Sequence, residues 1–150
     1  MAPRLYPYPA LQRALQRATR YSAAPHPILH HLGQELLGRL AEHKRAFKHI
    51  LLVQAGVTDL RPCLPAEMLA TAQVSVLNLT EVDIEGPLPE VVTRGGFEAI
   101  ILAQVLPWVH DVPRLLLTFG RLLKPDGLLL ADALGANSFS PLTQAWAEVG

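Results

Sequence analysis

The sequence predicts a three-layer α/β domain with a mainly parallel sheet, in which helices cover both faces. Short apolar runs, typical of strands buried on both faces, occur at 49–55, 74–79, 97–104 and 128–131. Helical stretches at about 65–72 and 112–123 lie between these runs. Because apolar strands that alternate with helices form βαβ units, we expect a parallel sheet. One domain is expected over 1–150, with a helical part at 1–47 and an α/β core at 48–150.

Two amphipathic helices are predicted before the first strand. In the first, at about 10–21, apolar residues recur every three or four positions, and Arg13, Arg17 and Arg20 fall on another face. The second, at about 28–46, carries a broad stripe of leucines. Both patterns predict helices that pack one side against the core.

The helix at 112–123 has recognisable start and stop signals. Asp111 is expected to cap its amino end, and Pro113 fits the first turn, where a missing N–H costs little. The segment Pro125-Asp-Gly127 is expected to end the helix and to turn the chain into the last strand.

Composition excludes several classes of protein. Thirteen basic and thirteen acidic residues cancel, so the chain lacks the positive field of a nucleic-acid-binding protein. The longest apolar run, 99–109, is too short to span a membrane. Cys63 is the single cysteine and forms no internal disulfide, which favours a reducing compartment. We therefore expect a cytoplasmic protein, with an organelle matrix as the alternative.

The charge is unevenly distributed along the chain. Residues 1–48 hold eight basic and two acidic residues, and residues 49–111 hold two basic and eight acidic residues. The arginine face of the first helix is therefore expected to contact an acidic surface, either within 49–111 or on a partner.

Three segments resemble class I S-adenosylmethionine (SAM) dependent methyltransferases. Leu-Leu-Lys-Pro-Asp-Gly at 122–127, followed by Leu-Leu-Leu-Ala, resembles the turn before that family's fifth strand. Phe-Glu-Ala-Ile-Ile at 97–101 resembles its fourth strand, and Trp-Val-His-Asp-Val-Pro at 108–113 resembles the following helix start. The pattern is similar to one branch, the biotin-pathway malonyl-carrier-protein methyltransferases and the methyltransferase-like assembly factors of respiratory complex I. The helix and strand at 21–52 also resemble that branch.

The resemblance implies a Rossmann-like methyltransferase fold, here curtailed. The family's strand order places the second, first, fourth and fifth strands side by side. Only 40 residues separate Gly56 from Phe97, so one βα unit is expected to be missing or reduced. The chain also stops at Gly150, where the family adds a terminal pair of antiparallel strands.

The resemblance implies SAM as the cofactor, bound after the first strand. The family carries a D-x-G-x-G-x-G-type loop there, because SAM lies against bare backbone. The matching segment is Leu-Val-Gln-Ala-Gly-Val-Thr at 52–58. Gly56 matches, whereas Leu52 replaces the acid and Gln54 and Thr58 replace glycines.

Two further residues complete the candidate SAM site. Asn78 lies where the family places an acid for the ribose hydroxyls, and Gln104 is the last residue of the predicted strand at 97–104. The predicted cofactor-binding residues are therefore Gln54, Gly56, Asn78 and Gln104.

Trp108 and His110 are predicted to line the substrate cleft, because the loop after this strand lies beside the cleft in the family. No catalytic residue is assigned. No metal site is predicted either, because no cysteine or carboxylate at ligand spacing joins His26 and His30.

Two functions remain open. If the family activity is retained, the chain transfers a methyl group from SAM to an oxygen of a small acid or of a carrier-bound acyl carboxylate. The alternative is a catalytically inactive binding or assembly module of the same fold that no longer binds SAM.

The last strand is the predicted partner-binding element. Leu128 to Ala131 is expected at an uncovered sheet edge, where it can pair with a protein partner or with a second copy of the chain. In the alternative arrangement, the tail at 137–149 folds back as a helix and covers this edge.

Overall fold

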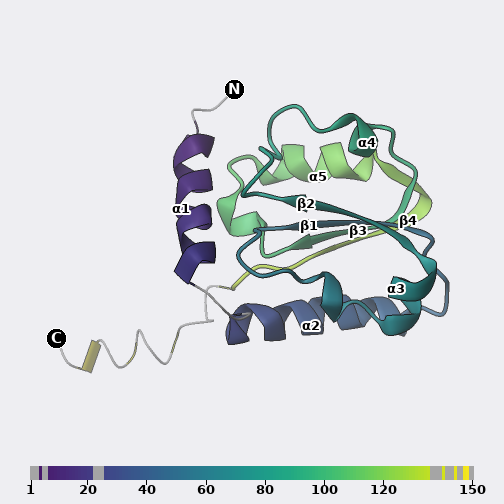
Figure 1. Ribbon diagram of the computed structural model, residues 1–150, viewed down its shortest axis with the longest axis horizontal. Coiled ribbons are helices and arrows are strands. Elements are labelled where there is room, and N and C mark those ends of the chain that lie inside the picture. The colour runs from purple at the N-terminus through teal and green to yellow at the C-terminus, as the bar shows by residue number, and fades with distance from the viewer. Residues whose placement is uncertain are drawn as a thin grey trace.

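The computed structural model describes residues 4, 7–21, 26–135, 140, 144 and 147–148. These residues form an α/β fold around a four-stranded sheet, with all strands parallel and in the order β2-β1-β3-β4 (Figure 1). The strands are β1 (His49–Gln54), β2 (Gln73–Asn78), β3 (Phe97–Ala103) and β4 (Leu123–Ala131). Both the predicted fold class and the predicted strand order are confirmed.

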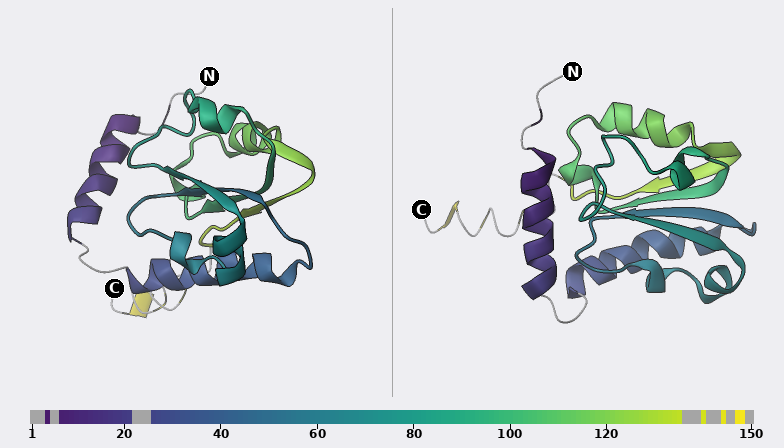
Figure 2. Two further views of the ribbon diagram at one scale, coloured as in Figure 1. Left: turned by 45° about the vertical axis from the view of Figure 1, so that its right-hand side comes forward. Right: turned by 45° about the horizontal axis from the view of Figure 1, so that its top comes forward.

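Helices lie on both faces of the sheet. The main helices are α1 (Tyr8–Tyr21), α2 (Pro27–Glu42) and α5 (Val112–Gly120), and the short helices are α3 (Ala66–Thr71), α4 (Glu90–Thr93) and the 3-10 turns η1 (Arg61–Cys63) and η2 (Leu106–Trp108). Figures 1 and 2 show α2 and α3 on one face and α4 and α5 on the other. Helix α1 lies across the carboxyl-terminal ends of the strands (Figure 1).

Apolar side chains fill both interfaces between the sheet and the helices. Ile50 and Leu52 of β1 face α2, whereas Leu51 and Val53 face α5, and all four are fully buried. A strand covered on both faces needs a continuous apolar run, which is why the 49–55 segment was recognisable in the sequence.

The connection from β2 to β3 is reduced, as expected. Residues 79–96, all described, contain the four-residue helix α4 and no strand. β1 pairs with β2 on one side and with β3 on the other.

Helix boundaries differ from the predictions in two places. Helix α2 ends at Glu42 and not at 46, because His43 is already extended, with ψ 120°, and the chain turns toward β1. Helix α5 ends at Gly120 and not at 123, although Asp111 caps it as predicted by accepting a bond from the Arg114 N–H at 3.0 Å.

The Pro125-Asp-Gly127 segment does not end a helix, and that prediction is wrong. It lies inside β4, which begins at Leu123, where the pairing of β3 with β4 shifts register between Phe97 and Ala99. Asp126 has a φ of 63°, so the turn chemistry forms an irregularity within a strand.

β4 is an edge strand of the sheet among the described residues. The tail helix at 137–149, the alternative to an uncovered edge, falls largely outside the described residues. No helix in the described part of the chain is long and apolar enough to cross a membrane.

Candidate functional site

The carboxyl ends of the strands form the candidate site. The connection from β1 to β2 passes through α3 on one face of the sheet, and the connection from β3 to β4 passes through α5 on the other face (Figure 1). The strand order therefore reverses between β1 and β3, and ligands of open parallel sheets bind at such a point. Gln54 is in register with Asn78 of β2 and with Ala103 of β3. The four predicted cofactor-binding residues therefore all lie at this edge.

The structure brings Gln54 and Asn78 together. Gln54 is 3% exposed, and its Nε2 donates to the Asn78 Oδ1 at 2.8 Å. Its Oε1 accepts a bond from the backbone N–H of Leu60 at 2.9 Å. The Gln54 amide thus links the ends of β1 and β2 to the loop that leads into η1.

Gly56 is required by the packing of the chain itself. Its φ is +87°, and a Cβ built on it would lie 2.7 Å from the Thr80 Oγ1 and 3.2 Å from the Asn78 Cβ. The neighbouring Thr58 is buried, and its hydroxyl oxygen accepts a bond from the His26 N–H at 3.3 Å. The loop after β1 therefore packs against β2 and the start of α2.

Gln104 takes part in a different set of contacts. Its Nε2 donates to the Leu29 carbonyl of α2 at 2.7 Å, and its backbone N–H donates to the carboxylate of Asp132. Its φ of 60° is uncommon for a residue with a side chain. Gln104 thus ties the end of β3 to α2 and to the residue after β4.

Sequence reasoning missed Asp132. Burial raises the pKa of its carboxyl, whereas the bond from the Gln104 N–H acts in the opposite direction. The sequence did hold a signal for it. Asp132 is an acid directly after an apolar strand, and the other candidate residues were also placed at the carboxyl-terminal ends of strands.

Trp108 and His110, the residues predicted for the substrate cleft, both line one small cavity. The cavity measures about 60 Å³ and is also lined by Arg4, Tyr8, Asp83 and Glu85. A space of this size holds a few water molecules, whereas small-molecule sites measure roughly 300–1,000 Å³. Trp108 is 39% exposed.

Polar contacts within the chain hold the walls of this cavity. Arg4 pairs with Asp83 at 2.7 Å, and the Glu85 carboxylate accepts bonds from the backbone N–H groups of His110 and Asp111. Tyr8 donates its hydroxyl to the Leu79 carbonyl at 2.9 Å, and burial, aided by the nearby Asp83 charge, raises the pKa of this phenol. The sequence analysis did not predict that Arg4, Tyr8 or Glu85 would line this cavity.

The residues present do not fit SAM in the way the resemblance implies. Leu52, at the position of the family's acid, is fully buried in the core beneath α2. The Gln54 amide is bonded to Asn78 and Leu60, and the space in front of Gly56 is occupied by Thr80. No step of a reaction is therefore derived through this cofactor.

Cys63 of η1 is the single cysteine of the chain. Burial raises the pKa of the Cys63 thiol, an effect that Asp59 reinforces, so the thiol is held protonated. Within the described ranges, no three His, Cys, Asp or Glu side chains come together in a way that could hold a metal ion.

Comparison with known proteins gives one partial similarity. The chain is 34% identical over 53 residues to the biotin biosynthesis bifunctional protein BioHC of Saccharophagus degradans. The similarity covers 35% of this chain and 10% of that protein. No protein-family model matches the chain.

Proposed function

We propose that this chain is a methyltransferase-fold binding module in which its own side chains fill the crevice that holds SAM in the family. The observation that carries the proposal is the Gln54 amide, which is nearly fully buried and bonded on one side to Asn78 and on the other to Leu60. Displacing it for a ligand would leave buried polar groups without partners, which costs about 1–3 kcal/mol for each group.

The packing of Gly56 supports the same proposal. Thr80 lies where a ligand would have to approach the bare backbone, and Gln12 and Gln16 of α1 hold the Thr80 carbonyl at 2.9 and 3.1 Å. Helix α1 therefore fixes the segment that closes the crevice. A ligand would have to move both the segment and the helix.

A second candidate function is methyl transfer from SAM to an oxygen of a small acid or of a carrier-bound acyl carboxylate. The partial similarity to the biotin biosynthesis protein favours it, because the sequence resemblance points to methyltransferases of the same pathway.

Calorimetric titration of the purified chain with SAM distinguishes the two candidates. The binding module is expected to bind SAM with a dissociation constant no tighter than about 1 mM, equivalent to about −4 kcal/mol. A constant in the low micromolar range would overturn the proposal in favour of the enzyme.

The partner of this module would bind at the edge of β4. The Asp132 N–H donates to the Leu102 carbonyl, so the backbone groups of alternate residues, Leu129 and Ala131, point away from β3. An open row of donors and acceptors beside leucine side chains is a template for a further strand, from a protein partner or from a second copy of the chain.

Ala131→Pro tests this edge without removing a bond between β3 and β4. Ala131 is exposed, and proline removes the N–H that faces outward. If the parent forms dimers by light scattering, the variant should shift toward monomer with an unchanged melting temperature. Equal association of parent and variant would contradict pairing through this edge. A parent that stays monomeric and binds no strand of a partner protein would also contradict it.

A further inference from the structure

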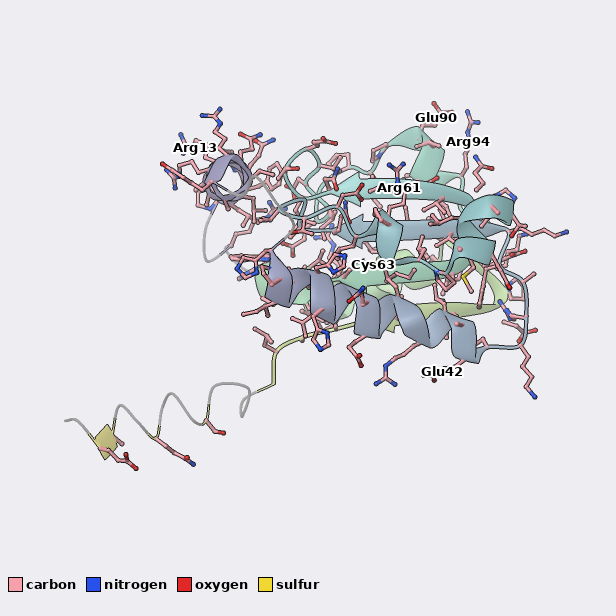
Figure 3. The ribbon with its side chains drawn as sticks, turned by 60° about the horizontal axis from the view of Figure 1, so that its bottom comes forward. Arg13, Glu42, Arg61, Cys63, Glu90 and Arg94 are labelled. Carbon is pink, nitrogen blue, oxygen red and sulfur yellow. The ribbon has the colours of Figure 1, made fainter. Side chains whose placement is uncertain are left out.

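A wide hollow lies at the opposite end of the strands from the candidate site. It is a groove of about 710 Å³ between the carboxyl-terminal end of α2, the 43–47 loop and α3. Figure 3 shows this region beside Glu42, the last residue of α2. Its volume falls within the range of small-molecule sites, whereas the cavity beside Trp108 is far smaller.

Apolar side chains form the floor of the groove. Met68 and Pro65 are half-buried there, and Ala46 and Ala70 are exposed, so these four side chains present apolar surface to the groove. Phe47 is 1% exposed and supports the groove from beneath. Such a surface binds the hydrocarbon part of a ligand, because contact removes apolar area from water.

Positive charge gathers along one wall. The sequence from His43 to His49 reads His-Lys-Arg-Ala-Phe-Lys-His, and its first three residues line the groove. Glu67 is the one acidic residue of the lining. The wall therefore favours an anion.

The two full cations of the wall differ in their contacts. Arg45 is fixed, because it donates to the Asp126 carbonyl at 2.7 Å and lies 4.8 Å from the centre of the Phe47 ring. Lys44 is exposed and forms no ion pair with any described acid. Lys44 is thus the cation that a ligand can pair with at no cost to the fold.

We propose that this groove binds an amphipathic organic anion, with an apolar body of about a dozen carbons against Met68 and Pro65 and a carboxylate or phosphate near Lys44. This site is separate from the carboxyl-end crevice, and the inference does not depend on the proposed function. The proposed ligand would bind at the amino-terminal ends of the strands, where the sequence pattern suggested no site.

Methionine methyl NMR with defined probes tests the proposal. The chain has two methionines, Met1 and Met68, so the Met68 methyl group reports directly on the groove. Dodecanoate and dodecyl phosphate, below their micelle concentrations, are the two anionic probes. Dodecanol tests the need for charge, and inorganic phosphate tests the need for the apolar body.

The expected result is a saturable shift of the Met68 signal with a dissociation constant below about 1 mM for at least one anionic probe. Dodecanol and phosphate are expected to bind at least several-fold more weakly. The stronger of the two anionic probes identifies the preferred head group. No saturable Met68 shift with either anion, or equal binding of dodecanol, would overturn the proposal.

A charge-reversal variant, Lys44→Glu, tests whether Lys44 pairs with the anionic head group, and Arg13→Glu is the matched control. Both side chains are exposed, and both changes reverse one charge, but Arg13 lies on α1 at the other end of the strands (Figure 3). Lys44→Glu should weaken anion binding by about 3- to 30-fold, since an attraction becomes a repulsion of similar size. Equal affinities of the two variants would contradict a role for Lys44.

Discussion

Replacing Gly56 by alanine tests whether the loop after β1 is shaped by the chain's own packing. At a φ of +87°, an alanine costs about 1–2 kcal/mol. Its Cβ would also lie 2.7 Å from the Thr80 Oγ1 and 3.0 Å from the Thr80 Cγ2, an overpacking that costs about 1–3 kcal/mol. We therefore expect Gly56→Ala to lower the free energy of unfolding by about 2–5 kcal/mol.

A double-mutant cycle separates the two contributions. Thr80→Ala removes both close atoms but leaves the backbone strain, so it should recover about 1–3 kcal/mol of the cost of Gly56→Ala. Urea unfolding of the parent, both single variants and the double variant measures this coupling. Gly38→Ala is the matched control, because open space surrounds Gly38 in α2, and alanine there should stabilise the helix by up to about 1 kcal/mol.

Two results would refute this reasoning. One is a Gly56→Ala variant within about 0.5 kcal/mol of the parent, the usual range for a surface substitution. The other is a coupling energy near zero, which would show that Thr80 does not restrict the loop.

Two further predictions concern charge. Burial raises the pKa of the Asp132 carboxyl, so its contribution to stability is complete below the unfolded-state pKa of about 3.9 and is lost as pH rises through the folded-state value. Asp132→Asn keeps an acceptor for the Gln104 N–H and should remove this decline. The melting temperatures of parent and variant are measured from pH 3 to 7, and an equal dependence on pH in both proteins would contradict the prediction. Arg13, Arg17 and Arg20 are exposed and form no ion pair with a described acid, so reversing all three to Glu should leave the melting temperature unchanged at low and high salt. A salt-dependent loss of stability would instead place their acidic partner within the chain.

Most of the fold could be predicted because its signals are local. Three features depend only on a few neighbouring residues or on a simple length: the apolar run of β1, the cap at Asp111 and the spacing between Gly56 and Phe97. The structure agrees with each of these within one or two positions. The failure at Pro125-Asp-Gly127 has a physical cause, since the same turn residues serve a helix end and a bulge within a strand.

The candidate site was predictable by position but not by contact. The predicted residues were Gln54, Gly56, Asn78 and Gln104, and each lies at the end of an expected strand or directly after it. That Gln54 bonds to Asn78, or that Gln104 reaches Leu29, depends on the mutual placement of elements far apart in the chain. No periodicity or spacing encodes such pairs.

Unfolding the chain in urea with and without 1 mM SAM tests the central claim most directly. A ligand that binds only the folded state raises the free energy of unfolding by RT ln(1 + [L]/Kd). With the crevice closed by Gln54, Asn78 and Thr80, we predict a rise of at most about 0.4 kcal/mol, the value for a dissociation constant of 1 mM or weaker. A rise near 2.7 kcal/mol, expected for a constant of about 10 μM, would contradict the account.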